Sequence, residues 1–188
     1  DGRLNYQAGI LNGVADGGSG DIEFADDDKE FAGRLFALPF KSSNIDVLRG
    51  LGIGLAGTAG NQEGSLRGFT TPGQQRFFCY RTGTGINAAS ANVSADGEHW
   101  RLAPQAYYYW GPLGIFGEYT LSEQQVRRDD GSATFRTLRN TAWQVAASYF
   151  VTGEDNSFRP VVPKNPLNPA ESGWGAWELA ARVRDRGS

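Results

Sequence analysis

Apolar and polar residues alternate with a period of two in the stretch that begins at Leu113. One set of alternate positions carries Leu, Ile, Gly, Tyr and Leu, and the intervening set carries Glu118 among Gly, Phe, Thr and Ser. A β-strand sends successive side chains to opposite faces of its sheet. The pattern therefore predicts a strand over residues 113–124 with one apolar and one polar face, preceded by a turn at Gly111-Pro112.

The same period recurs along most of the chain. Many of the alternating segments span about ten residues, which is longer than an average soluble strand and close to the length that crosses a membrane. Apolar residues do not recur at intervals of three and four, so strands are favoured over helices, although the composition of residues 176–184 would also suit a helix. Residues 31–40 and 75–82 show no clear faces. The other strands are predicted over residues 4–10, 31–40, 47–55, 75–82, 99–110, 140–151 and 176–184.

Polar, turn-rich segments connect these strands. Residues 129–132 (Asp-Asp-Gly-Ser) are typical of the turn of a β-hairpin. Within the strand predicted over residues 99–110, Pro104 favours an edge position or a bulge, because proline has no amide hydrogen to donate. The alternation of long and short connectors breaks between residues 79 and 110, so either residues 86–94 contain one more strand or one connector is unusually long. Longer connectors are expected at residues 14–29, 60–74, 83–97 and 154–173.

Charge and rare residues exclude several classes of function. The net charge is −3, which gives no electrostatic case for nucleic acid as a partner. Cys79 is the only cysteine, so an internal disulfide is excluded. His99 is the only histidine, which disfavours a His-based catalytic triad and a metal site with several histidine ligands. The glycines of residues 50–54 are not followed by a helix pattern, which disfavours a nucleotide-binding site there. The acidic run of residues 26–28 is expected to lie in a solvated loop. No metal or cofactor is expected.

Two architectures are compatible with the alternation. In a soluble β-sandwich the apolar face packs inward, whereas in a membrane β-barrel the apolar face meets lipid and the polar face lines a water-filled lumen. No window of about 18 apolar residues is present, which excludes a transmembrane helix but not such a barrel. Aromatic residues near strand ends would suit membrane interfaces. These candidate interface aromatics are Trp100, Trp110, Trp143, Tyr149 and Trp177.

Several runs of residues resemble the phosphate-selective porin O and P family. The resemblance is strongest from Trp100 onward and also includes residues 30–40, 141–169 and 173–183. Its more specific elements are Gly-Glu-Tyr following the Gly-Pro turn, and the run Trp-Gln-Val-Ala-Ala-Ser-Tyr followed by Thr-Gly-Glu.

This resemblance implies an all-β fold, namely a transmembrane antiparallel β-barrel of sixteen strands in the bacterial outer membrane. It also implies that the barrel forms a homotrimer and lets anions such as phosphate pass by passive diffusion. Residues 1–188 would supply about eight strands of this single barrel domain, as an internal portion of a longer polypeptide. A complete eight-stranded barrel is the alternative strand count. A general porin without phosphate preference and a soluble β-sandwich binding module are the alternative functions.

Cationic side chains would carry anion selectivity in a porin, because arginine and lysine lining a pore favour anions. By parity, Arg101, Arg182 and Arg184 are predicted on the polar face, and each could instead be a solvated rim charge or the partner of a carboxylate. A carbohydrate-active enzyme that pairs Glu118 with Glu178 is not favoured, since nothing brings them together. Further candidates, of unclear face or at a pore mouth, are Arg34, Arg76, Arg81 and Lys41.

Overall fold

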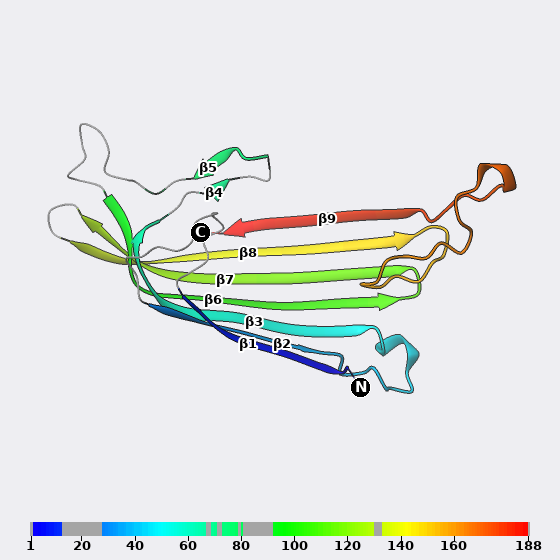
Figure 1. Cartoon of the computed structure of the whole chain (residues 1–188), viewed down its shortest axis with the longest axis horizontal. Coiled ribbons are helices and arrows are strands. Elements are labelled where there is room, and N and C mark those ends of the chain that lie inside the picture. The colour runs from blue at the N-terminus through cyan, green and yellow to red at the C-terminus, as the bar shows by residue number, and fades with distance from the viewer. Residues whose placement is uncertain are drawn as a thin grey trace.

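The computed structural model describes residues 2–12, 28–66, 69–70, 73–78, 80, 92–129 and 133–187. Seven of its strands form one antiparallel sheet in the order β1-β2-β3-β6-β7-β8-β9, and β4 and β5 form a separate two-stranded sheet. Figure 1 shows the seven strands side by side. The strands are β1 (Leu4–Asn12), β2 (Lys29–Ala37), β3 (Leu51–Ser65), β4 (Phe69–Thr70), β5 (Arg76–Phe78), β6 (Asn92–Trp110), β7 (Leu113–Asp129), β8 (Thr134–Phe150) and β9 (Glu178–Gly187).

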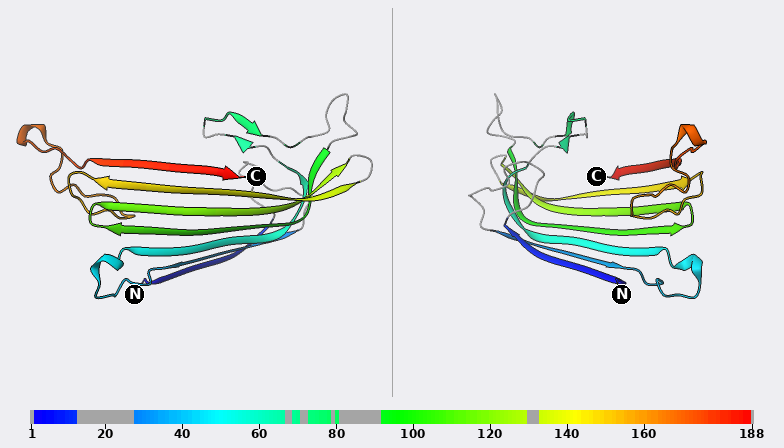
Figure 2. Two further views of the ribbon diagram at one scale, coloured as in Figure 1. Left: turned by 180° about the vertical axis from the view of Figure 1, so that it is seen from behind. Right: turned by 45° about the vertical axis from the view of Figure 1, so that its right-hand side comes forward.

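The large sheet is open and forms a single layer over most of its length (Figure 2). Its edge strands are β1 and β9, which lie at opposite ends of the strand order. Short 3-10 helices occupy Asp46–Leu48 in the β2–β3 connector and Pro169–Glu171 in the β8–β9 connector. The described part of the chain is therefore all-β and antiparallel, as predicted.

The pairing register keeps residues of one parity on one face across the whole sheet. Val145 lies between Gly117 and Val183, whereas the neighbouring Gln144 lies between Glu118 and Arg184. We call the face with Val145 the apolar face and the face with Gln144 the polar face. Members of the apolar face include Leu4, Tyr6, Leu35, Ile53, Leu55, Leu102, Ile115, Tyr119, Trp143, Val145, Tyr149, Leu179 and Val183.

Several predicted strand bounds are corrected. β6 begins at Asn92, so residues 92–97 belong to this long strand and not to a connector, and no separate strand is formed by residues 92–94. β3 likewise begins at Leu51 and continues to Ser65, so Val47 and Arg49, which the predicted strand over residues 47–55 included, precede it. Only residues 76–78 of the segment predicted over 75–82 form a described strand, and this strand pairs with the short β4. Residues 178–187 form β9 rather than a helix.

Two irregularities interrupt β6 without ending it. The register with β7 shifts between Ala95 and His99, where Gly97 adopts a φ of 120° that L-residues with side chains rarely adopt. Pro104 lies in the middle of this central strand, and within the described β6–β7 pair neither it nor Ala103 has a register partner in β7. Of the two placements predicted for Pro104, an edge position or a bulge, the edge position is wrong because β6 is a central strand. The strand accommodates the missing donor by leaving two positions of one ladder unpaired.

Candidate functional site

The apolar face carries a band of exposed hydrophobic side chains. Trp143 is 41% exposed and Val145 is 47% exposed, although both lie in the interior of a central region of the sheet. Among the described residues, only Ala95, Val126 and Phe150 are buried hydrophobics, and no second sheet packs against this face. The packing that a soluble β-sandwich requires is therefore not formed by the described residues.

The band has defined limits along the strands. At one end, Leu113 of β7 is level with Trp110 and Tyr149. At the other end, the ion pair between Arg139 Nε and Glu123 Oε1 (3.4 Å) follows the last apolar row. Residues 113–123 span about 34 Å along an antiparallel strand, or about 26 Å across a bilayer at a tilt of about 40°. That height is close to the apolar band of about 25 Å in outer-membrane barrels.

Four of the five predicted interface aromatics lie near the limits of this band, and Trp143 lies closer to its middle. Trp110 and Tyr149 share the row of Leu113, and the backbone carbonyl of Trp177 accepts a hydrogen bond from the amide of Val151 just beyond them (2.9 Å). Trp100 is level with Glu123 at the opposite limit, and Trp143 is paired with Tyr119 one row inside the last apolar pair. Trp110, Tyr149 and Trp177 thus mark one limit of the band and Trp100 marks the other, whereas Trp143 lies between them.

The polar face contains an ion pair that joins two strands across a third. Arg101 Nη2 of β6 donates to Glu30 Oε1 of β2 at 2.7 Å, and Arg101 Nε donates to Thr58 Oγ1 of the intervening β3 at 3.0 Å. The His99 ring lies beside this pair, with Nε2 3.3 Å from Ser122 Oγ. Arg101 therefore lies on the face predicted for it, with a carboxylate partner that the sequence pattern did not identify.

The other predicted cationic residues have different surroundings. Arg182 and Arg184 point with Gln144 to the polar face, and within the described residues neither has a carboxylate within ion-pair distance. Arg34, also on the polar face, lies 5.7 Å from the centroid of the Phe36 ring. Of the remaining predicted cations, Arg76 lies in the small β4–β5 sheet and Lys41 lies in the β2–β3 connector. Arg81 and the single Cys79 lie outside the described residues.

The two carboxylates of the disfavoured glycosidase hypothesis are far apart. Glu118 is level with Arg184, whereas Glu178 lies six residues away along β9. This separation is about 20 Å at 3.3 Å per residue, whereas glycosidase carboxylates lie about 5–9.5 Å apart. A shallow pocket on the sheet instead brings Glu118, Gln144 and Arg184 to a common lining, with opposite charges in the same row of polar side chains.

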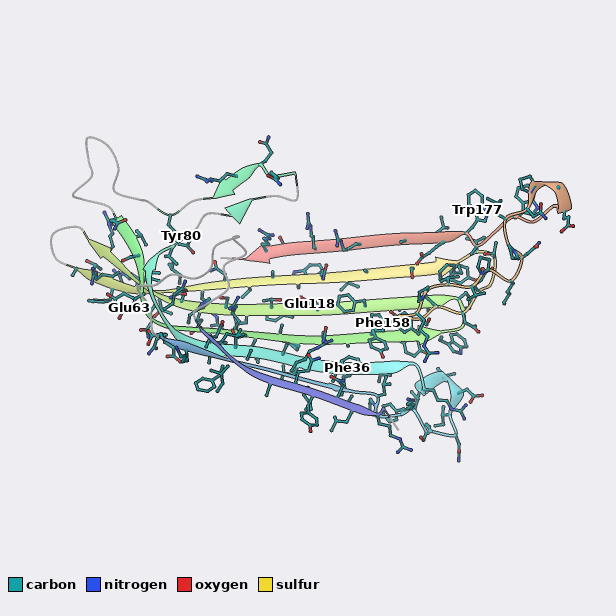
Figure 3. The ribbon with its side chains drawn as sticks, in the orientation of Figure 1. Phe36, Glu63, Tyr80, Glu118, Phe158 and Trp177 are labelled. Carbon is teal, nitrogen blue, oxygen red and sulfur yellow. The ribbon has the colours of Figure 1, made fainter. Side chains whose placement is uncertain are left out.

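The β8–β9 connector lies against the polar face at one end of the sheet. Phe158 makes edge contacts with the rings of Tyr107 and Tyr109, with centroids 4.5 Å and 5.2 Å apart, and Tyr107 stacks on Phe36 at 5.3 Å. Figure 3 shows Phe158 over the ends of the central strands, near Phe36. The long proline-rich connector therefore extends inward over the polar face.

Asn156 anchors the connector with hydrogen bonds. Its backbone amide donates to the carbonyl of Gly111 (2.7 Å), and its side-chain Nδ2 donates to Ser148 Oγ (2.6 Å). A Cβ atom on Gly114 would come within 2.7 Å of this side-chain nitrogen. The absence of a side chain at position 114 therefore makes room for the anchor.

Glu154 holds the first turn of the connector. It accepts hydrogen bonds from the Thr152 hydroxyl and from the Lys164 amide (3.1 Å). The Thr152 hydrogen bond has the largest effect and lowers the pKa of Glu154 from the ordinary value of 4.5; desolvation opposes this shift and the Lys164 amide reinforces it. The carboxylate therefore favours the closed connector in its charged form.

Acid is expected to loosen the connector through Glu154. Because the folded-state pKa is lowered, the stabilisation is complete above the unfolded value of 4.5 and is lost as the pH falls through the folded-state pKa. Protection of the Lys164 amide against hydrogen exchange, corrected for the intrinsic rate at each pH, should fall over that range. Glu154→Gln should remove the pH dependence. The Arg159 amide, which donates to Ser157 Oγ (3.1 Å), is the control, and an equal loss of protection there would contradict the assignment.

The residues that sequence reasoning missed are Glu30, Asn156 and Phe158. Glu30 directly precedes the strand predicted over residues 31–40, whose faces were not assigned, and the other two lie in a predicted loop. Alternation around Phe31 and Leu35 could have assigned Glu30 to the polar parity, but its pairing with Arg101 needs the strand order. Asn156 and Phe158 carry no periodic signal.

The described residues show neither a metal cluster nor a spanning helix. Within the described ranges, no three His, Cys, Asp or Glu side chains are grouped to hold a metal ion. No helix formed by those residues is long and apolar enough to cross a membrane.

Comparison with known proteins identifies the family of the chain. The sequence model of the family described as phosphate-selective porin O and P matches residues 80–185, which is more than half of the 188-residue chain. The chain matches no curated protein and no solved structure. The match covers β6, β7 and β8 and nearly all of β9, the strands that carry the best-defined apolar band. The chain belongs to the phosphate-selective porin O and P family, whose members are channels rather than enzymes.

Proposed function

We propose that this chain forms part of the wall of a water-filled β-barrel in a bacterial outer membrane, through which small anions such as phosphate diffuse passively. The observation that carries the proposal is the contrast between the two faces of one sheet. Val145 and its neighbours form an exposed apolar band of bilayer height, and Gln144 and its neighbours form a polar face with arginines. Lipid would cover the first face and water would fill the space beside the second.

Closure of the barrel requires further strands. Seven strands with antiparallel neighbours leave β1 and β9 running in the same direction. A barrel with antiparallel neighbours throughout needs an even number of strands, so an odd number must be added. The sixteen strands expected for the family meet this condition, and we propose that chain beyond these 188 residues supplies them. The backbone N–H and C=O groups along the outer edges of β1 and β9 would be unpaired in lipid, which costs free energy. This cost also requires further strands that pair with both edges.

The anion preference is proposed to come from arginines of β9. Arg182 and Arg184 alternate with Val183, so both guanidinium groups lie on the polar face. Arginine donates two parallel hydrogen bonds to a phosphate and keeps its charge at all physiological pH values. Two such side chains on one strand would attract anions along the water-filled path.

A general diffusion porin is the second candidate. Glu30 and Glu118 lie on the same polar face as the arginines, and Glu30 is paired with Arg101. These carboxylates reduce the positive charge that an anion would meet. A channel with weak anion preference and no response to phosphate would fit this second candidate.

Planar-bilayer recordings of the complete porin chain separate the two candidates. In a potassium chloride gradient the reversal potential should indicate anion preference, and added phosphate should reduce the chloride current. The double variant Arg182→Gln/Arg184→Gln should shift the reversal potential toward the cation value. Arg139→Gln is the matched control, because Arg139 pairs with Glu123 on the apolar face. A cation-selective wild-type channel would contradict anion conduction, and folding in buffer without detergent would contradict the pore.

A further inference from the structure

Glu30 is the most shielded charged side chain of the described polar face, with 1% of its surface exposed. It lies on β2 opposite Gly60 of β3. A Cβ atom on Gly60 would come within 2.9 Å of the Glu30 Cα atom and 3.2 Å of its Cβ atom. The glycine therefore leaves space in which the Glu30 side chain can extend across β3 toward β6.

Arg101 reaches Glu30 from the opposite side of β3. The two residues are 71 positions apart in the sequence, and their charged groups meet at 2.7 Å. Thr58 holds the guanidinium from β3 through the bond to Nε (3.0 Å). Arg101 itself remains 34% exposed, so its guanidinium borders the space beside the polar face while one edge faces the carboxylate.

This pairing changes what Arg101 offers to an anion. A paired guanidinium and carboxylate present a dipole whose field falls off faster than that of a single charge. The guanidinium edge formed by Nε and Nη2 donates to Thr58 and Glu30, so this edge is not available for a bidentate contact with phosphate. Arg182 and Arg184 have no such carboxylate among the described residues.

We propose that Glu30 is a selectivity-determining residue that keeps Arg101 from binding anions. Its carboxylate occupies the guanidinium and offsets its charge, so that anion recognition rests on the other arginines of the polar face. Removal of the carboxylate converts Arg101 into an additional phosphate-binding group. The inference rests on the proposed function, because it assigns a role within the same water-filled path.

The experiment measures block of chloride current by inorganic phosphate in bilayer recordings of the complete porin chain. Glu30→Gln keeps the size of the side chain and removes its charge, and it should lower the half-blocking phosphate concentration about tenfold, the gain expected from one additional charge-assisted hydrogen bond. Glu30→Asp, which keeps the charge but shortens the side chain, should give a smaller change in the same direction. This second variant keeps the test informative if Glu30→Gln fails to fold.

A double variant and a matched control separate the release of Arg101 from a change in net charge. In Arg101→Gln/Glu30→Gln the half-blocking concentration should return to within about twofold of wild type, since no guanidinium is available to form the charge-assisted contact. Glu118→Gln removes the same charge from the same face and should change the block by less than about threefold, because Glu118 has no arginine within ion-pair distance among the described residues.

Two results would overturn the inference while leaving the proposed function intact. One is conducting Glu30→Gln and Glu30→Asp channels with wild-type phosphate block. The other is an effect of Glu30→Gln that persists when Arg101 is absent. Failure of the wild-type chain to conduct would instead overturn the proposed function, and the inference with it.

Discussion

Arginine in place of Ala147 should destabilise the protein in lipid bilayers by about 1–2 kcal/mol, whereas arginine in place of the adjacent Ala146 should be tolerated. Ala147 lies on the apolar face between Ile115 and Ala181, and Ala146 lies on the polar face next to Phe116. Arginine on the lipid face of a barrel costs about 2–4 kcal/mol near the bilayer midplane and about 0–1 kcal/mol near the interfaces, and Ala147 lies between these depths, one row inside the limit at Leu113. The same side chain on the other face meets water in the proposed pore.

The measurement is the folded fraction of each variant of the complete porin chain in lipid vesicles, followed by guanidinium titration. Both substitutions replace alanine with arginine in neighbouring positions of β8, so propensity and size are matched. Ala146→Arg should fold like wild type and shift the reversal potential toward anions. If Ala147→Arg folds equally well, the apolar face does not contact hydrocarbon and the assignment of the faces fails.

Release of the β8–β9 connector should enlarge the water-filled path. Asn156 and Phe158 hold this connector on the polar face through a side-chain hydrogen bond of 2.6 Å and two edge-on ring contacts. One such hydrogen bond contributes about 1 kcal/mol and each aromatic pair about 0.5–1.5 kcal/mol. Removing them together should therefore cost about 2–4 kcal/mol and raise the undocked population of the connector by about 30-fold or more.

Single-channel conductance of Asn156→Ala/Phe158→Ala should consequently rise and fluctuate more than that of wild type. Val162→Ala is the control, because Val162 lies in the same connector and is 83% exposed. Gly114→Ala should reproduce part of the effect by displacing the Asn156 side chain, whereas Gly117→Ala, where an added Cβ meets nothing within 4 Å, should not. Unchanged conductance in the double variant would show that the connector does not narrow the path.

The alternation of residues predicted the central strands because it is a local property. In Leu113–Asp129, side chains two positions apart share a face whatever their partners are, so the apolar and polar sets around Glu118 could be assigned before any pairing was known. The same holds for Trp143 and Gln144 in β8. The prediction was weakest where both faces are polar, as in the part of β6 that includes Asp96 and Gly97. Beyond the apolar band, strands need no alternation, and β6 is extended there by its pairing with β3 and β7.

Candidate cations were placed on a face by parity, but their partners were not predictable. Glu30 and Arg101 meet because β2, β3 and β6 are neighbours, and this order follows from pairing along the whole sheet. The docking of Phe158 depends on the path of a connector with no periodic pattern. By contrast, the family resemblance was visible in short runs such as Gly-Glu-Tyr after the Gly-Pro turn.

The sequence by itself therefore determined the strand-rich fold, the separation of two faces and the family, because these depend on side-chain order along single segments. Tertiary structure alone decided which charges neutralise one another and which connector covers the polar face. Those contacts join residues tens of positions apart, and a period of two carries no information about which strands become neighbours.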